Sequence, residues 1–251
     1  MRSNVEWKEW GNVDPLFGVA SIDGRSRGGP DPWTEEEFYG WGATNWAEYL
    51  RHWECYGLNT NSCVEIGCGA GRMTKQLARY FCFVHAVDVS ADMIAIARKN
   101  VCSDNVRFYL SGGSDLPIAD SSAMAAFSCE VFQHFNSPIA ARDYLRELYR
   151  VLDRAGTLMI GLPVYRWPKP LTRYRLVYRL TRVCDVLKAE VRRFLIAIGC
   201  GSPFMYLIEY EAPWLARTLT EIGFDEIEVR FFYNTAIPLK RFGSWIFARK
   251  P

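Results

Sequence analysis

Three glycines at alternate positions, Gly67, Gly69 and Gly71, follow a short apolar run and constrain the fold more than any other feature of this sequence. A β-carbon would block both a tight turn and the close approach of a ligand, so the spacing predicts a binding loop at the carboxyl end of a β-strand. Position 72 is arginine, so the loop lacks the last glycine of the dinucleotide fingerprint. The acidic Glu65 before the loop suits an ammonium or a sulfonium better than a phosphate, by charge complementarity.

Short apolar runs alternate with helical periods on both sides of this loop, a pattern typical of βαβ units. We expect strands at 63–66, 83–87, 106–109, 125–129 and 157–162, with helices at 71–80, 91–100 and 139–152. A helix at 213–222 and a closing pair of strands at 227–233 and 244–248 follow. The sequence therefore predicts an α/β, doubly wound, mostly parallel seven-stranded sheet of the Rossmann-like kind, which forms one domain over residues 61–251.

The first 60 residues hold six of the nine tryptophans and predict an N-terminal cap segment, a flexible entry followed by a helix. Thr34 is the expected N-cap of that helix, with Glu37 as its capping-box partner. Most aromatic rings at 38–42 are expected to anchor the cap to the sheet by buried area. Tyr39 is our candidate for a ring that contacts a sulfonium by cation–π attraction.

Residues 174–198 carry an apolar stripe at helical spacing and predict one long helix, within a helical lid insertion over 165–210 that follows the fifth strand. Residues 165–198 hold nine basic and two acidic side chains, a local net charge of +7. Three interpretations stay open: an acidic or amphipathic substrate or partner, docking on an anionic membrane surface, or a solvated basic face.

Overall composition narrows the function classes. The net charge of +2 is too small to predict a nucleic-acid partner, and 49% apolar residues suit a large core. The eight cysteines form no C-x-x-C pair, so we expect free thiols and no metal site. Without an apolar N-terminal stretch or a spanning segment, the sequence predicts a soluble, cytoplasmic protein. No feature sets the oligomeric state.

Asp88 ends the second predicted strand, where a carboxylate can accept hydrogen bonds from both hydroxyls of a ribose. The run at 64–71, together with the run at 86–94, resembles the class I S-adenosylmethionine-dependent methyltransferases. Further matches occur in the order of that family at 115–117, 127–134, 147–152 and 221–224. The resemblance covers residues 60–165 well and 210–249 loosely.

This resemblance implies S-adenosylmethionine as the cofactor and S-adenosylhomocysteine as the product. It implies that Glu65 faces the methionine amino end, that the three glycines face the ribose and methionine backbone, and that Asp88 takes the ribose hydroxyls. The remaining implied cofactor residues are Val89 and Met93 beside the adenine, and Glu130 through its backbone. Many relatives carry an acid at the position of Gly112, so Ser114, Asp115 or backbone atoms must replace that contact.

Methyl transfer from a sulfonium needs positioning more than acid–base chemistry, although a hydroxyl acceptor would gain from a base. His134 is our candidate base, and the alternative is that it caps or packs the next helix. We predict transfer to a small molecule, with oxygen preferred, in specialised-metabolite or glycan or lipid biosynthesis. The alternatives are N- or C-methylation and a non-catalytic cofactor-binding subunit. The missing glycine disfavours a nicotinamide-dependent oxidoreductase.

Overall fold

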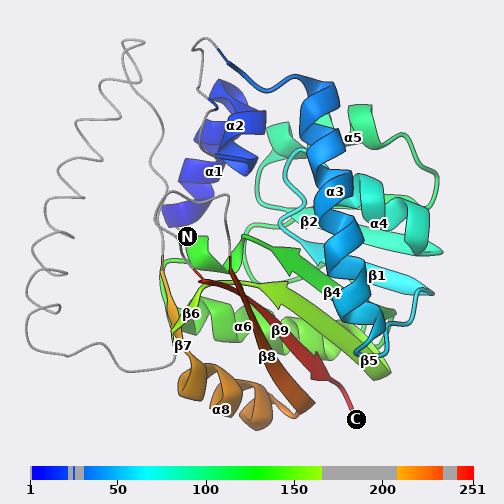
Figure 1. Ribbon diagram of the computed structural model, residues 1–251, viewed down its shortest axis with the longest axis vertical. Helices are drawn as coiled ribbons and strands as arrows, with labels where there is room; N and C mark the ends of the chain where they lie inside the picture. The colour runs from blue at the N-terminus through cyan, green and yellow to red at the C-terminus, as the bar shows by residue number, and fades with distance from the viewer. Residues whose placement is uncertain (1, 22–24, 26–30, 166–207, 234–241) are drawn as a thin grey trace, which may run out of the picture.

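A seven-stranded sheet forms the centre of the computed structural model, which describes residues 2–21, 25, 31–165, 208–233 and 242–251 (Figure 1). The strand order is β3-β2-β1-β4-β5-β9-β8. The strands are β1 (Ser62–Ile66), β2 (Phe83–Asp88), β3 (Val106–Leu110), β4 (Ala123–Cys129), β5 (Leu152–Gly161), β8 (Asp225–Tyr233) and β9 (Phe242–Arg249). β1 to β5 are parallel, and β9 runs antiparallel between β5 and β8. The predicted doubly wound sheet is confirmed.

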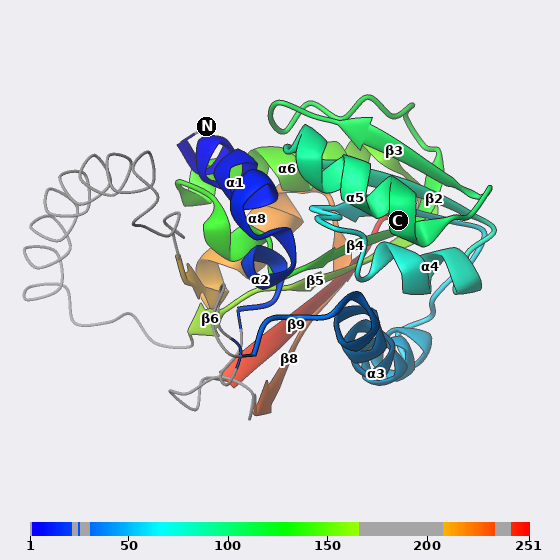
Figure 2. The ribbon, with the colours of Figure 1, turned by 90° about the horizontal axis from the view of Figure 1, so that it is seen from above.

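Helices cover both faces of this sheet, because neighbouring strand residues point to opposite sides. One face packs against α3 (Glu35–Glu54), α4 (Thr74–Tyr80) and α5 (Ala91–Val101), and the other against α6 (Pro138–Val151) and α8 (Ala212–Ile222). Figure 2 shows α3 and α4 on one side and α6 and α8 on the other. In β1, for example, Cys63 packs on the α3 side and Val64 on the α6 side.

The helix α3 begins where the sequence predicted, with both hydrogen bonds of the capping box between Thr34 and Glu37. Its tryptophans Trp46 and Trp53 are almost fully buried against Phe127 of β4. The indole N–H of Trp53 donates to the Thr157 hydroxyl across 2.9 Å, which satisfies that buried donor. These aromatic rings anchor α3 to the sheet, as expected for large side chains.

The flexible N-terminal entry that the sequence predicted is wrong for the described part of that segment, which forms α1 (Arg2–Val13) and α2 (Pro15–Val19). Asp14 caps α2 by accepting a bond from the backbone N–H of Phe17. Trp10 is 3% exposed, in a cluster with Phe38 and Met93. Short helices gain most of their stability from such tertiary burial. The spacing of apolar residues in this segment therefore did not predict the two helices.

Two element boundaries also differ from the predictions. α4 starts at Thr74 rather than at residue 71, because Gly69 and Gly71 have positive φ angles that a right-handed helix excludes. α6 ends at Val151, and Leu152 already pairs with Ala123 as the first residue of β5.

The predicted lid insertion lies almost entirely outside the described residues. The short strands β6 (Val164–Tyr165) and β7 (Tyr210–Glu211), which flank it, pair in parallel as a separate two-stranded sheet. The helix expected at 174–198 therefore stays a prediction. In the described part of the chain, no helix combines the length and the apolar character needed to cross a bilayer.

Candidate active site

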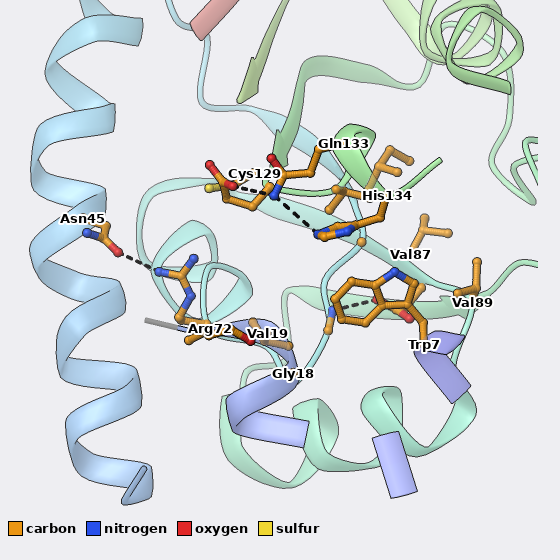
Figure 3. A pocket seen from close by; sticks show the side chains of 18 of the residues that line it. Trp7, Gly18, Val19, Asn45, Arg72, Val87, Val89, Cys129, Gln133 and His134 are labelled. Carbon is orange, nitrogen blue, oxygen red and sulfur yellow. Dashed lines mark hydrogen bonds between the residues drawn. The ribbon is translucent and has the colours of Figure 1, made fainter. Parts of the chain in front are cut away.

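A cavity of about 440 Å³ opens at the carboxyl ends of β1, β2 and β4 (Figure 3). Its walls come from those strand ends, from one face of α3, and from α1 and α2, whose Trp7 and Val19 point into it. In open α/β sheets, ligands bind outside the carboxyl ends of the strands. The cavity therefore lies where the sequence placed the glycine loop.

Two of the three glycines of the loop, Gly67 and Gly69, line this cavity. Both have positive φ, at 74° and 52°. A β-carbon on Gly67 would come within 2.3 Å of the Val131 side chain, and one on Gly69 within 2.8 Å of Val19. The loop therefore requires glycine at both positions, and the space that the missing side chains leave forms part of the cavity.

Gly71, the third glycine, is not among the residues that line the cavity, so its contact with the cofactor stays a prediction. Its φ is 85°, and an added β-carbon would lie 2.9 Å from Val101 and 3.0 Å from Ala97 of α5. Gly71 thus allows the loop to pack closely against α5.

Asp88 lies in the cavity wall and holds the loop in place. Its Oδ2 accepts a bond from the backbone N–H of Gly69 at 2.8 Å, and its Oδ1 accepts one from the N–H of Ser90 at 2.9 Å. Burial raises the pKa of this carboxyl, and these backbone donors oppose the change. The carboxylate oxygens keep further lone pairs, so Asp88 can still accept bonds from a ligand in the cavity.

Glu65 lies behind the loop and is not among the residues that line the cavity. It is 3% exposed, and its Oε2 accepts a bond from the Thr74 hydroxyl at 2.6 Å. Burial raises the pKa of Glu65 to about 7; the Thr74 bond lowers it and Asp88 raises it further. The structure thus shows Glu65 joined to the start of α4.

Four other predicted cofactor residues divide between the cavity and its surroundings. Val89 lines the cavity, whereas Met93, Tyr39 and Ser114 do not. Met93 is 1% exposed in the cluster beneath α1. The Tyr39 hydroxyl donates to the carbonyl of Ala70 at 2.7 Å, so this ring supports the loop from outside.

Glu130, Gln133 and His134 form a polar group on the cavity wall just beyond β4. Glu130 has a φ of 61°, a left-handed conformation that costs a non-glycine residue roughly 1–2 kcal/mol. Its Oε2 accepts a bond from Gln133 Nε2 at 2.6 Å. Burial raises the pKa of Glu130, against the effect of the Gln133 bond, although the side chain stays accessible from the cavity.

His134 is 5% exposed and lines the same cavity as Asp88 and the glycines. Its Nε2 lies 3.4 Å from Gln133 Nε2. The Trp7 ring meets the imidazole edge to face, with 4.9 Å between the ring centroids. Helix α1 thus reaches the residue that the sequence singled out as a base (Figure 3).

Comparison with known proteins identifies the domain that carries this cavity. Residues 64–160, which include the glycine loop, Asp88 and His134, match the family described as "Methyltransferase domain". The chain carries a class I S-adenosylmethionine-dependent methyltransferase domain. S-adenosylmethionine is the cofactor of such a domain.

Individual relatives match this methyltransferase domain to different extents. The malonyl-[acyl-carrier protein] O-methyltransferase of Priestia megaterium is 35% identical over 100 residues, which is 39% of this chain and 35% of the relative. The demethylmenaquinone methyltransferase of Tropheryma whipplei is 27% identical over 187 residues, 71% of this chain and 72% of the relative. The match with the Priestia enzyme thus spans about a third of that enzyme's length.

Solved structures share the fold of the methyltransferase domain across nearly all of the chain. Magnesium protoporphyrin IX methyltransferase from Synechocystis, solved with bound S-adenosylhomocysteine, has a TM-score of 0.62 at 14% identity and covers 99% of this chain and 100% of its own. The N-methyltransferase NodS from Bradyrhizobium japonicum has a TM-score of 0.62 at 15% identity, with full coverage of both chains. At these identities the likeness establishes the fold.

The residues of the methyltransferase domain fit this cofactor. Two glycines leave the space of their missing side chains in the cavity, and the Asp88 carboxylate retains capacity to accept hydrogen bonds. When bound, S-adenosylmethionine supplies a methyl group on a sulfonium centre. Gly67, Gly69, Asp88 and Val89 are the predicted cofactor residues that could hold its nucleoside part, since they line the cavity together.

One face of α3 and the residue next to the loop belong to the site but were not predicted from the sequence. Trp41, Asn45 and Tyr49 recur at helical spacing and line the cavity with Arg72. The spacing of four was the available signal. Arg72 interrupts the dinucleotide pattern, and that pattern gives no sign that its side chain lines the cavity.

Proposed function

We propose that this chain transfers the methyl group of S-adenosylmethionine to an oxygen atom of a small-molecule acceptor. The observation that carries the proposal is that His134 and the loop residues Gly67 and Gly69 line one cavity. A histidine at that position can remove the proton of a hydroxyl as it is methylated. Relatives named as O-methyltransferases, for malonyl-[acyl-carrier protein] and in ubiquinone biosynthesis, support an oxygen acceptor.

The acceptor is inferred to be small and partly apolar. The cavity of about 440 Å³ lies within the range of small-molecule sites and has to admit the cofactor as well. Several aromatic side chains contribute to its walls, with Trp7 from α1, Trp41 and Tyr49 from α3, and Phe232 from β8. Flat apolar faces beside a few polar groups favour an aromatic or amphipathic hydroxyl compound.

A nitrogen acceptor is the second candidate, and the carboxylate of Glu130 favours it. This side chain is accessible from the cavity beside His134, where it could attract an ammonium group. Relatives of known structure include the N-methyltransferase NodS. An amine acceptor would make Glu130 the more important of the two residues.

Turnover with methyl-labelled S-adenosylmethionine tests these proposals. The purified chain is incubated with panels of phenols, carboxylic acids and amines, and mass spectrometry identifies the methylated atom. We expect an oxygen product and a loss of roughly 10²–10⁴ in turnover for His134→Ala, with the affinity for S-adenosylhomocysteine changed by less than about twofold. His52→Ala, in the last turn of α3 and outside the cavity lining, is the matched control.

Three results would count against the leading proposal. If His134→Ala methylates an oxygen acceptor as fast as the wild type does, His134 is not the catalytic base. If the product is a methylated amine and Glu130→Gln abolishes its formation, the nitrogen acceptor replaces the oxygen acceptor as the proposal. Absence of any labelled product with intact S-adenosylhomocysteine binding would favour the non-catalytic subunit.

A further inference from the structure

Arg72 is a buried cation in the cavity wall, and no carboxylate of the described residues lies within ion-pair distance of it. It follows the glycine loop directly, is 4% exposed, and lines the cavity. Its Nη1 donates to Asn45 Oδ1 at 2.7 Å, and its guanidinium lies 4.5 Å from the centre of the Trp41 ring. The buried Nε has no hydrogen-bond partner, and no carboxylate in the described part of the chain forms an ion pair with Arg72.

The buried Arg72 guanidinium destabilises the folded protein unless an anion binds beside it. A buried charge without a counter-charge destabilises the folded state, and a buried N–H without an acceptor destabilises it further. Glu65 and Glu130 act on Arg72 only as longer-range charges. The Glu65 carboxylate accepts its bond from Thr74, and the Glu130 carboxylate accepts one from Gln133. Asn45, Trp41 and Cys129 offer an amide, a ring face and a thiol. None of these is a full negative charge, because burial raises the pKa of the Cys129 thiol.

The donors left on these two residues match a carboxylate. A guanidinium presents its N–H groups in a flat fork that suits two coplanar oxygens. Asn45 accepts from Arg72 through Oδ1, and its amide Nδ2 makes no other hydrogen bond within the described part of the chain. One guanidinium and one neutral amide balance a single negative charge, whereas the nearby Glu130 and Asp88 would repel a phosphate dianion.

We propose that Arg72 and Asn45 form a carboxylate-binding subsite of this cavity. The carboxylate could belong to the amino-acid part of the cofactor or to an acidic acceptor, and both present the same group to the guanidinium. In Figure 3, Arg72 and Asn45 lie toward α3, across the cavity from Val87 and Val89. This proposal rests on the proposed function in one respect: the ligand that carries the carboxylate is the cofactor or the acceptor of the methyl transfer.

Calorimetry with two adenosine thioethers tests the cofactor as the source. S-adenosylhomocysteine carries a carboxylate, and 5′-deoxy-5′-methylthioadenosine lacks the whole amino-acid part. If the cofactor supplies the carboxylate, Arg72→Gln weakens S-adenosylhomocysteine binding roughly tenfold or more and leaves methylthioadenosine binding within about twofold. Arg79→Gln, an exposed arginine on the helix α4 that follows the loop, is the control and should change neither.

A second arm tests an acidic acceptor. The chain saturated with S-adenosylhomocysteine is titrated with benzoate and with benzamide, which is its neutral counterpart. If the acceptor supplies the carboxylate, benzoate alone binds to the wild-type complex and Arg72→Gln abolishes that binding, while the affinity for S-adenosylhomocysteine does not change. Asn45→Leu should cause the same selective loss of carboxylate binding in either experiment. This second variant carries the test if Arg72→Gln does not fold.

The proposal is overturned by either of two outcomes. In one, the variants weaken both thioethers equally, which indicates a distorted loop. In the other, they change neither S-adenosylhomocysteine nor benzoate binding. Because every measurement is of binding, the result is independent of whether any acceptor is methylated.

Discussion

Gly69 donates its backbone N–H to Asp88 Oδ2 across 2.8 Å, which joins the loop after β1 to the end of β2. The same carboxylate accepts a second backbone bond from Ser90 at the start of α5. One side chain therefore fixes the positions of two segments that meet at the cavity, and still has lone pairs for a ligand.

Replacing Asp88 by Ala should weaken S-adenosylhomocysteine binding by more than the loss of a single ligand contact. Each charge-assisted hydrogen bond contributes roughly 1.5–3 kcal/mol, and the Gly69 loop loses its anchor as well. Calorimetry measures the affinity, with Asp104→Ala, an exposed aspartate beyond α5, as the control. An unchanged dissociation constant for Asp88→Ala would refute the role of this carboxylate at the ribose.

The Trp7 ring covers His134, so Trp7→Ala should open the cavity to water. Trp7 lines the cavity as well as packing on His134, so we expect its loss to weaken the affinity for S-adenosylhomocysteine about twofold to tenfold, the size of one aromatic contact. Val5→Ala on the same helix removes an exposed side chain and should bind normally. If both variants bind as the wild type does, α1 does not contribute to the closed cavity.

Glu65 should make the stability of the protein depend on pH. Burial raises the pKa of this carboxyl from 4.5 to about 7, so the folded state favours the protonated form. The stabilisation is complete below about pH 4.5 and is lost as the pH rises to about 7. At about 1.4 kcal/mol per pKa unit, the shift corresponds to about 3–4 kcal/mol.

Urea unfolding of the wild type and of Glu65→Gln between pH 4.5 and 7.5 measures this effect. The free energy of unfolding of the variant, relative to the wild type, should rise with pH because glutamine cannot ionise. The exposed Glu54→Gln serves as the control. Parallel pH profiles for the wild type and Glu65→Gln would show that Glu65 is not shifted.

Gly71→Ala should destabilise the fold by about 1–3 kcal/mol, because its β-carbon would press against Val101 and Ala97 in a left-handed backbone conformation. Gly112→Ala is the matched control, since a β-carbon there meets nothing within 4 Å. We expect the control to change the free energy of unfolding by less than about 0.5 kcal/mol. Equal free energies for the two variants in urea would contradict the close contact with α5.

The sheet was predictable from the sequence because each strand carries its own signal. In β1 and β4, neighbouring residues such as Cys63 and Val64, or Ala126 and Phe127, are apolar on both faces, as parallel strands covered by helices require. The glycine loop and Asp88 were found for a similar reason. Their chemistry depends on the order of residues at strand ends, and the parallel sheet brings those ends together.

The N-terminal wall of the cavity was not predictable in the same way. Trp7 and Val19 lie in short helices with no strong apolar stripe, and their partners His134 and Gly69 are 127 and 50 positions away. Tyr39 and Trp41 are two residues apart on α3, so they face different directions: one supports the loop and the other lines the cavity.

The sequence by itself determined the α/β sheet, the loop that requires glycine, and the family to which the domain belongs, because these features depend on local spacing. Only the tertiary structure decided that Glu65 lies behind the loop, that Gly71 faces α5, and that Arg72 is buried beside Asn45. Burial and charge pairing depend on distant segments packing together, and no local pattern of residues encodes those distances.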